Sequence, residues 1–192
     1  MKTINELFYQ VILLNELSGN KSAALRFSDP DGPSGRSGWS FGLCQFDTKH
    51  NGEAIRCLVD CGFTDGEIRK IVAQTINVVP LAARLIAHAD IIAAYDTVQL
   101  SRCINSAMNA VTGAGVLVHD TGAILCLADY VNQYGSIGPG FLAWMNERDS
   151  DGITAAEIQE WKLKHTKYGR EHAKDCVRRY KNVLKVVADN VG

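Results

Sequence analysis

Apolar residues recur at helical spacing along most of this chain. At the start, Thr3-Ile4-Asn5-Glu6 has the form of a capping box, in which a threonine and a glutamate cap the first turn of a helix. The apolar residues that follow fit one helical face, so we expect an opening helix with Glu16 near its C-terminal end. The same spacing predicts further helices over residues 51–61, 65–75, 81–95, 97–110, 120–134, 139–147, 154–166 and 168–189. Two of these begin at capping boxes, Thr64 to Glu67 and Thr154 to Glu157.

The segment after the opening helix has a different pattern. Residues 18–40 are rich in Gly, Ser, Asp and Pro, and Asp29-Pro30-Asp31-Gly32-Pro33 is the clearest turn. Any β-structure is expected here. The sequence therefore predicts a mostly α fold, in which a small loop or β lobe over about residues 18–47 stands beside a helical remainder in one domain, residues 1–192.

Composition and charge limit the classes of protein to which this chain could belong. With 192 residues, 46% of them hydrophobic, and a net charge of −1, the chain can bury one core and lacks the overall basic character of a nucleic-acid-binding protein. Basic residues outnumber acidic ones between Trp161 and Lys185, which predicts a solvated helix face or, alternatively, attraction to an anionic polymer. No apolar run is long enough to span a bilayer or to form a secretory signal, so we expect synthesis in a cytoplasm.

Six cysteines are present, but their spacing is not that of a disulfide-stapled small domain, so we expect reduced, buried thiols. Cys57 and Cys61 lie four residues apart on an expected helix and could bind a metal only with two further ligands from elsewhere. No metal site and no cofactor are predicted.

The stretch Ser37-Gly38-Trp39-Ser40-Phe41-Gly42-Leu43-Cys44-Gln45-Phe46-Asp47, together with Glu16, suggests glycosidic chemistry. Glycoside cleavage needs a carboxylic acid that protonates the leaving oxygen, and a second group that positions or replaces the nucleophile. Glu16 and Asp47 are the candidates. Asp47 could instead cap the turn that begins at Thr48, and Asp29 or Asp31 could be the second carboxylate, although turn formation explains both.

Two motifs in the first fifty residues carry a family resemblance. Phe41-Gly42-Leu43-Cys44-Gln45-Phe46-Asp47 resembles the Gly-Leu-Met-Gln signature of goose-type lysozymes and lytic transglycosylases, with Cys44 in place of Met. Leu13-Leu14-Asn15-Glu16-Leu17-Ser18-Gly19 resembles the helix ending in Glu-Ser of that family, with Leu17 inserted. Ala128 to Gly135 is similar to the Ala-Tyr-Asn segment that lines its cleft, at a different spacing.

The resemblance implies a lysozyme-like α+β fold and a bacteriophage endolysin that cleaves the β-1,4 bond between N-acetylmuramic acid and N-acetylglucosamine in peptidoglycan. Glu16 would be the general acid, and Asp47 would position a water molecule. The side chains expected to contact saccharide are those of Ser37, Phe41, Gln45, Tyr130 and Asn132, although core packing is the alternative for the aromatic residues. We expect a monomer that leaves the host cytoplasm to act on the periplasmic cell wall.

Three other functions stay open at this point. A lytic transglycosylase would use Glu16 as acid and then base and would leave 1,6-anhydro-muramic ends. A chitosanase or chitinase would share the Glu, the Gly-rich loop and the downstream Asp. A non-catalytic wall-binding or phage structural protein could have kept the fold.

Overall fold

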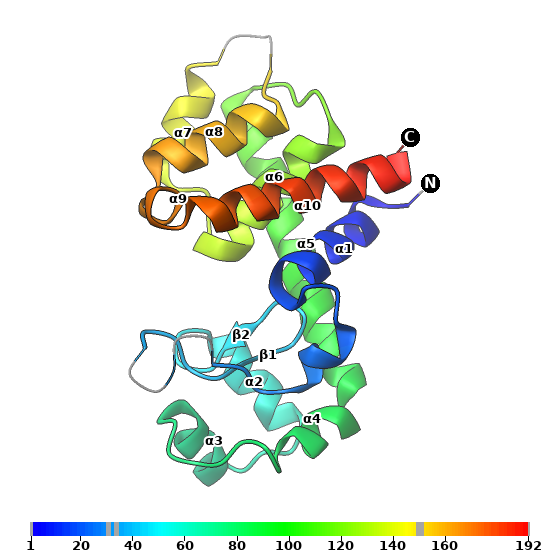
Figure 1. Cartoon of the computed structure of the whole chain (residues 1–192), viewed down its shortest axis with the longest axis vertical. Helices are drawn as coiled ribbons and strands as arrows, with labels where there is room; N and C mark the ends of the chain where they lie inside the picture. Colours follow the sequence, from blue (N-terminus) through cyan, green and yellow to red (C-terminus); the bar gives the residue numbers. More distant parts are fainter. Residues whose placement is uncertain (1, 30–31, 33–34, 149–151, 192) are drawn as a thin grey trace. The chain divides into compact units, whose positions relative to one another are not determined.

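The structure, a computed structural model, describes residues 2–29, 32, 35–148 and 152–191. Over these residues it is mostly helical, with ten α-helices, one 3₁₀ helix and one two-stranded antiparallel hairpin (Figure 1). None of the described helices is both long and apolar enough to cross a membrane. The mostly α character with a small hairpin agrees with the sequence prediction.

The chain divides into two compact units. Unit 1 comprises residues 1–15 and 100–192, and unit 2 comprises residues 16–99. Two helices have residues in both units, namely α1 (Ile4–Leu17) and α5 (Ala89–Ala114). The units are described one at a time below.

Unit 1 is built around α6 (Thr121–Tyr134), most of whose residues are buried. Helix α6 packs against α8 (Ala155–His165) and α10 (Ala173–Val191), which also contact each other. Two shorter helices of this unit are α7 (Pro139–Asn146) and α9 (Lys167–Glu171). Aromatic rings fill the space between α6, α7 and α8, where the Phe141 ring lies 5.1 Å from that of Tyr130 and 4.3 Å from that of Trp161.

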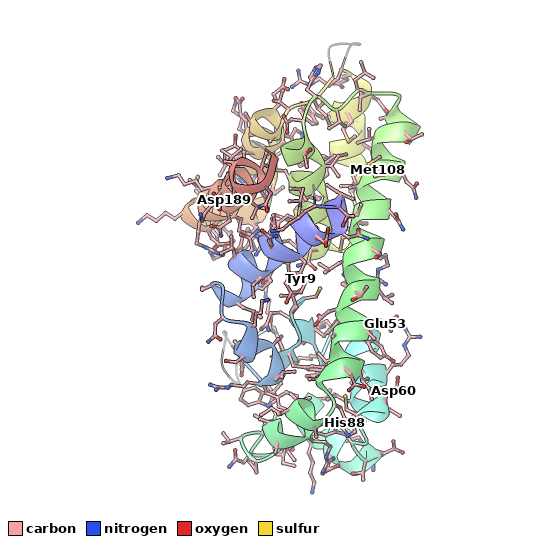
Figure 2. All side chains as sticks on the ribbon, turned by 90° about the vertical axis from the view of Figure 1, so that its right-hand side faces the viewer. Tyr9, Glu53, Asp60, His88, Met108 and Asp189 are labelled. Carbon is pink, nitrogen blue, oxygen red and sulfur yellow. The ribbon has the colours of Figure 1, made fainter. Side chains whose placement is uncertain are left out.

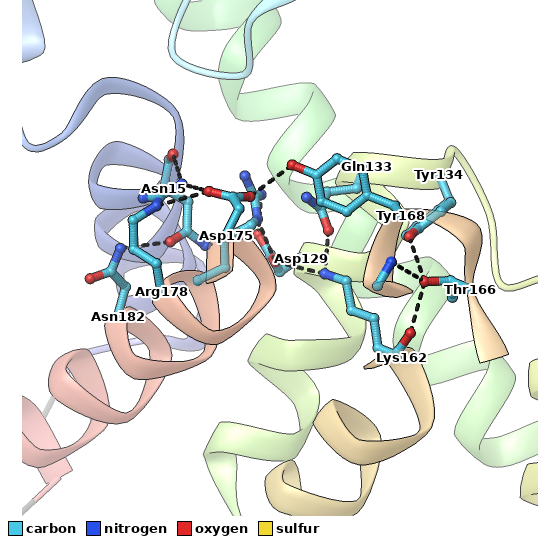
Figure 3. A network of polar contacts seen from close by, with 12 residues as sticks. Asn15, Asp129, Gln133, Tyr134, Lys162, Thr166, Tyr168, Asp175, Arg178 and Asn182 are labelled. Atoms are coloured by element: carbon cyan, nitrogen blue, oxygen red, sulfur yellow. Dashed lines mark hydrogen bonds and ion pairs between the residues drawn. The ribbon is translucent and has the colours of Figure 1, made fainter. Parts of the chain in front are cut away.

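A buried charge cluster also ties unit 1 together. The Asp129 carboxylate on α6 accepts two hydrogen bonds from the Arg179 guanidinium of α10 and one from the Asn15 amide, at 3.0 Å. Lys162 of α8 lies 3.8 Å from the same carboxylate and donates to Gln133 (Figure 3). The side chains of Asp129, Lys162 and Arg179 are each about 5% exposed, so this cluster holds one anion and two cations away from water.

Unit 2 surrounds a core of apolar side chains contributed by its hairpin and its α-helices. After the end of α1 come the 3₁₀ helix η1 (Lys21–Leu25), the strands β1 (Ser40–Phe41) and β2 (Phe46–Asp47), and the helices α2 (Gly52–Asp60), α3 (Asp65–Val72) and α4 (Ala82–Ala87). The strands pair in register Ser40 with Asp47 and Phe41 with Phe46. Phe41, Phe46 and Leu58 are at most 2% exposed, so the hairpin is anchored by its own side chains in the core.

All three predicted capping boxes are confirmed. The backbone N–H groups of Thr3, Thr64 and Thr154 donate to Glu6, Glu67 and Glu157 at 2.7, 2.8 and 3.0 Å, and each threonine hydroxyl accepts the reciprocal bond. A capping box needs only residues within one turn of the chain, which is why the sequence locates these helix starts.

Two predicted helix boundaries are wrong. The helices expected over 81–95 and 97–110 are α4 and a continuous α5, with the break at His88. Thr97 does not cap a new helix, because its hydroxyl donates to the Ala93 carbonyl one turn earlier, at 2.8 Å. The helix expected over 168–189 is divided at His172 into α9 and α10.

Replacing Asp129 by Asn is expected to lower the free energy of unfolding by about 3 to 5 kcal/mol, because Arg179 and Lys162 would lose the buried carboxylate that both contact. The control is Asp189→Asn, which removes a solvent-exposed pair with Lys185 on α10 and should change stability by less than about 0.5 kcal/mol (Figure 2). Urea denaturation followed by circular dichroism measures both. Equal effects of the two substitutions would contradict the role given to the cluster.

The pH dependence of that contribution follows from the same contacts. Burial disfavours the charged form of Asp129, but Arg179 and Lys162 outweigh it, so the pKa of Asp129 lies below its usual value. The folded state therefore binds this proton less readily than the unfolded chain does. The stabilisation is complete above about pH 4, the ordinary aspartate pKa, and is lost as the pH falls further. We expect the stability difference between wild type and Asp129→Asn to shrink below pH 4 in the same urea experiment.

Candidate functional site

The candidate site is an open pocket of about 540 Å³ that belongs entirely to unit 2. Glu16, Asp29 and Gln45 bring two carboxyl groups and a carboxamide to its wall. The other residues that line it are Leu17, Ser18, Ala23, Ser28 and Ser40. The pocket thus draws on three segments of the chain: the end of α1, the stretch from η1 to Asp29, and the hairpin.

The end of helix α1 places Glu16 at the pocket. The helix stops at Leu17, after which Ser18 and Gly19 both take left-handed backbone conformations, with φ of +51° and +83°. The Asn20 N–H donates to the Leu17 carbonyl at 2.8 Å and closes this turn. Glu16 therefore lies on the last turn of α1, half-buried, as the sequence predicted from its position before Ser18.

The hairpin turn presents Gln45 to the same pocket. Its carboxamide oxygen accepts a bond from the Ser28 hydroxyl at 2.6 Å, and its amide group donates to the Gly42 carbonyl at 2.9 Å. A carboxamide has two N–H donors and two acceptor lone pairs, so each end retains hydrogen-bonding capacity beyond these contacts. The side chain is held in place and can still bind a polar ligand.

Asp29 is the second carboxylate of the pocket. One oxygen, Oδ2, accepts a hydrogen bond from the Gln74 amide at 2.7 Å. The other, Oδ1, is buried and has no hydrogen-bond partner in the part of the chain that the structure describes. A buried acceptor without a partner costs free energy, which points to a donor such as water or a ligand hydroxyl that completes the site. Asp31, the other aspartate of the predicted turn, lies outside the described residues.

Asp47 is not among the described residues that line the pocket. It lies on β2, and its Oδ1 atom accepts hydrogen bonds from the backbone N–H groups of Gly38 and Lys49, at 3.0 and 2.8 Å. These contacts match the capping role that the sequence offered as the alternative for Asp47. The pocket brings Asp29 together with Glu16 instead.

The four other residues predicted to contact saccharide lie outside this pocket. Ser37 is half-buried in the loop before β1, and Phe41 is fully buried, with its ring 5.7 Å from that of Phe27. Tyr130 and Asn132 belong to α6 of unit 1, where the Tyr130 ring is 6% exposed and stacks on that of Tyr134 at 4.3 Å. Core packing, the alternative considered for the aromatic residues, is the role in which the structure places Phe41 and Tyr130.

Sequence reasoning missed Ser28, Ser40 and Gln74. The backbones of Ser28 and Ser40 pair through two hydrogen bonds, of 2.8 and 2.7 Å, and this bridge brings Ser28 to Gln45. Gln74 reaches Asp29 across 45 positions of sequence from the end of α3. Neither contact has a local sequence signal, because each depends on how distant segments pack.

No group of three or more His, Cys, Asp or Glu side chains that could hold a metal ion occurs among the described residues. The six cysteines are free thiols, and all but Cys126 are buried. Cys57 and Cys61 interact with each other on α2, where the hydrogen bond from Cys57 lowers the pKa of the Cys61 thiol. The residues that line the pocket present carboxyl, carboxamide and hydroxyl groups.

Comparison with known proteins gives no relative for this chain. No protein-family model matches it, and searches of curated proteins and of solved structures found no significant match.

Substitution of Gly42 tests how tightly the hairpin turn is built. A Cβ atom there would lie 2.9 Å from the Phe46 ring and 3.1 Å from Asp96 Oδ1, at a backbone φ of +79°. Gly62 has a similar φ of +76° with no atom within 4 Å of an added Cβ, so it is a matched control for the backbone strain alone. We expect Gly62→Ala to cost about 1 to 2 kcal/mol of stability and Gly42→Ala about 1 to 3 kcal/mol more. Thermal unfolding measures both, and equal losses would contradict the close approach at Gly42.

Proposed function

We propose that this protein is a glycosidase of lysozyme-like fold that cleaves the β-1,4 bond between N-acetylmuramic acid and N-acetylglucosamine in bacterial peptidoglycan. The observation that carries the proposal is the presence of Glu16, Asp29 and Gln45 in one pocket of unit 2. Two carboxyl groups beside hydroxyl and amide groups suit a reaction that moves protons at a sugar oxygen while it holds the polar substituents of the ring. The resemblance of the Glu16 and Gln45 segments to goose-type lysozymes supports the same reaction.

In the proposed mechanism, Glu16 donates its proton to the glycosidic oxygen as the bond from that oxygen to the sugar carbon breaks. A water molecule then bonds to this carbon and gives up its proton to a carboxylate. Asp29 is better supported for the second role than Asp47, because it lines the pocket, while Asp47 is not among the described lining residues and its Oδ1 atom accepts two loop N–H groups. Gln45 would hydrogen-bond a hydroxyl or acetamido group of the sugar.

A lytic transglycosylase is the second candidate. It is favoured by the engagement of Asp47 in loop contacts, because that reaction needs no second carboxylate. Glu16 would then act first as acid and afterwards as base, and the sugar's own hydroxyl would close the anhydro ring. In either case we propose peptidoglycan as the substrate of a phage endolysin, acting as a monomer without a cofactor and reaching the wall from the host cytoplasm.

Glu16→Gln should slow the reaction strongly, since the neutral amide is too weak an acid to give the leaving oxygen the proton that it needs. A loss of about 10²- to 10⁴-fold in rate is expected. Mass spectrometry of the fragments released from purified peptidoglycan measures this, with folding of both proteins checked by circular dichroism. Fragments with reducing ends that the wild type releases and the variant does not would indicate a lysozyme. Fragments with anhydro ends that disappear in the same way would indicate a transglycosylase.

The same assay can contradict the proposal. Undiminished release by Glu16→Gln would remove Glu16 from the mechanism. Release from chitin or chitosan but not from peptidoglycan would favour the chitosanase or chitinase alternative. Binding to the wall by the wild-type protein without any released saccharide would favour a non-catalytic wall-binding or structural protein.

Asp29→Asn and Asp47→Asn form a matched pair that separates the two candidate second carboxylates. Asp29→Asn should lower the hydrolytic rate about 10²-fold or more, because the amide cannot take a proton from water. Asp47→Asn should leave the rate within a few-fold, since the amide oxygen can still accept from Gly38 and Lys49. Rates of reducing-end release measure both. A large loss of rate in Asp47→Asn with little change in Asp29→Asn would instead assign the role of second carboxylate to Asp47. Little change in either variant would favour transglycosylation.

A further inference from the structure

The turn that carries Gln45 is held by one buried carboxylate, that of Asp96. This residue lies on the part of α5 that belongs to unit 2 and is 6% exposed. Its Oδ2 atom accepts the Leu43 N–H and its Oδ1 atom accepts the Cys44 N–H, both at 2.9 Å. No ion pair to Asp96 occurs among the described residues, so these two backbone groups are its charge-assisted partners.

The turn needs such support because its backbone is strained at Gln45. Gln45 has a φ of +52°, a left-handed conformation that is unfavourable for a residue with a side chain. Such a conformation persists when surrounding contacts over-determine it. The two bonds to Asp96 fix the residues on the N-terminal side of Gln45, and β2 begins directly after it at Phe46.

A carboxylate is the side chain that suits this position. Both of its oxygens accept hydrogen bonds at once, whereas an asparagine of the same shape would set its NH₂ group against one of the two N–H donors. Gly42 fits the close approach, since an added Cβ would lie 3.1 Å from Asp96 Oδ1. The contact accordingly depends on the identity of Asp96 and not only on its size.

We propose that Asp96 is a positioning residue of the candidate site. It fixes the turn from Gly42 to Gln45, so that the Gln45 carboxamide is held at the pocket that contains Glu16 and Asp29 and orients the bound saccharide there. This inference rests on the proposed function of the pocket.

The titration of Asp96 gives the inference a distinctive readout. Burial raises the pKa of this carboxyl above its usual value, against the opposing effect of the Cys44 and Leu43 N–H groups. The titratable groups that face it are the thiols of Cys44 in the turn and of Cys57 on α2. Protonation of the Asp96 carboxylate would place an O–H group opposite an N–H donor, break that hydrogen bond and release part of the turn. Activity should therefore fall on acidification at a pH above the ordinary aspartate value of about 3.9.

The test is a double-mutant cycle of Asp96→Asn and Gln45→Ala in the full chain. Rates of saccharide release from peptidoglycan are measured across pH, together with thermal unfolding of each variant. We expect Asp96→Asn to lower kcat/KM about 10- to 100-fold, which is the loss that a misplaced binding group causes. The variant should also lack the fall in activity at acidic pH that protonation of Asp96 causes in the wild type. In the Gln45→Ala background, Asp96→Asn should have little further effect on rate, because the group that it positions is already absent.

Asp60→Asn is the control for loss of a carboxylate in the same unit. Asp60 is exposed at the end of α2 and accepts a hydrogen bond from the Tyr95 hydroxyl of α5 at 2.6 Å (Figure 2). It has no contact with the turn among the described hydrogen bonds, so its substitution should leave both the rate and the pH profile unchanged.

The cycle separates this inference from the proposed function. A wild-type protein that releases no saccharide would overturn the proposed function, and the positioning role with it. An active wild type with an equally active Asp96→Asn variant would overturn the positioning role alone. If Asp96→Asn lowers the rate by the same factor in the wild-type protein and in the Gln45→Ala variant, the positioning role would also be overturned, because that result would show a general loss of structure.

Discussion

The backbone pairing of Ser28 with Ser40 is the contact on which the candidate site depends. Its two hydrogen bonds, of 2.8 and 2.7 Å, join the segment after η1 to the first strand of the hairpin. This bridge places the Ser28 hydroxyl on the Gln45 carboxamide and brings Asp29, the next residue, to the pocket wall. Without it, the segment that carries Ser28 and Asp29 would not be joined to the hairpin that carries Gln45.

The hairpin is in turn fixed from both sides. Phe41 and Phe46 bury its two strands in the core of unit 2, and Asp96 binds the turn between them. Ser40 and Gln45 are thus attached to a short element whose apolar side chains cannot move without exposing a core. This arrangement provides the rigid support that the proposed proton transfer to a sugar oxygen would need.

Contacts between residues close together in the sequence were predictable, and contacts between distant segments were not. The three capping boxes were predictable because each needs residues within a single turn. The boundary expected between residues 95 and 97 was wrong because Asp96 and Thr97, which can cap helices, instead bond to the hairpin turn and to the preceding helical turn. Glu16 and Gln45 were predicted from their motifs, and both line one pocket. The turn pattern explained Asp29 locally, and only the structure shows its contact with Gln74 and its place at the pocket.

The similarity of residues 128–135 to a cleft segment shows the same limit. In unit 1, residues 128–134 belong to the second half of α6, and residues 128–131 are buried; Asp129 binds Arg179, and Tyr130 stacks between aromatic rings. Burial and charge pairing account for their identities in this unit. Short motifs such as this one do not distinguish a residue that binds a ligand from one that packs a helix.

We propose that the pocket of unit 2 binds the scissile bond with Glu16 at the glycosidic oxygen. The decisive measurement is a crystal structure of Glu16→Gln with an oligosaccharide of alternating N-acetylglucosamine and N-acetylmuramic acid. We expect a glycosidic oxygen within about 2.6 to 3.2 Å of the side chain at position 16, with Gln45 and Asp29 contacting the flanking sugar or a bound water. A saccharide bound elsewhere, with this pocket empty, would contradict it.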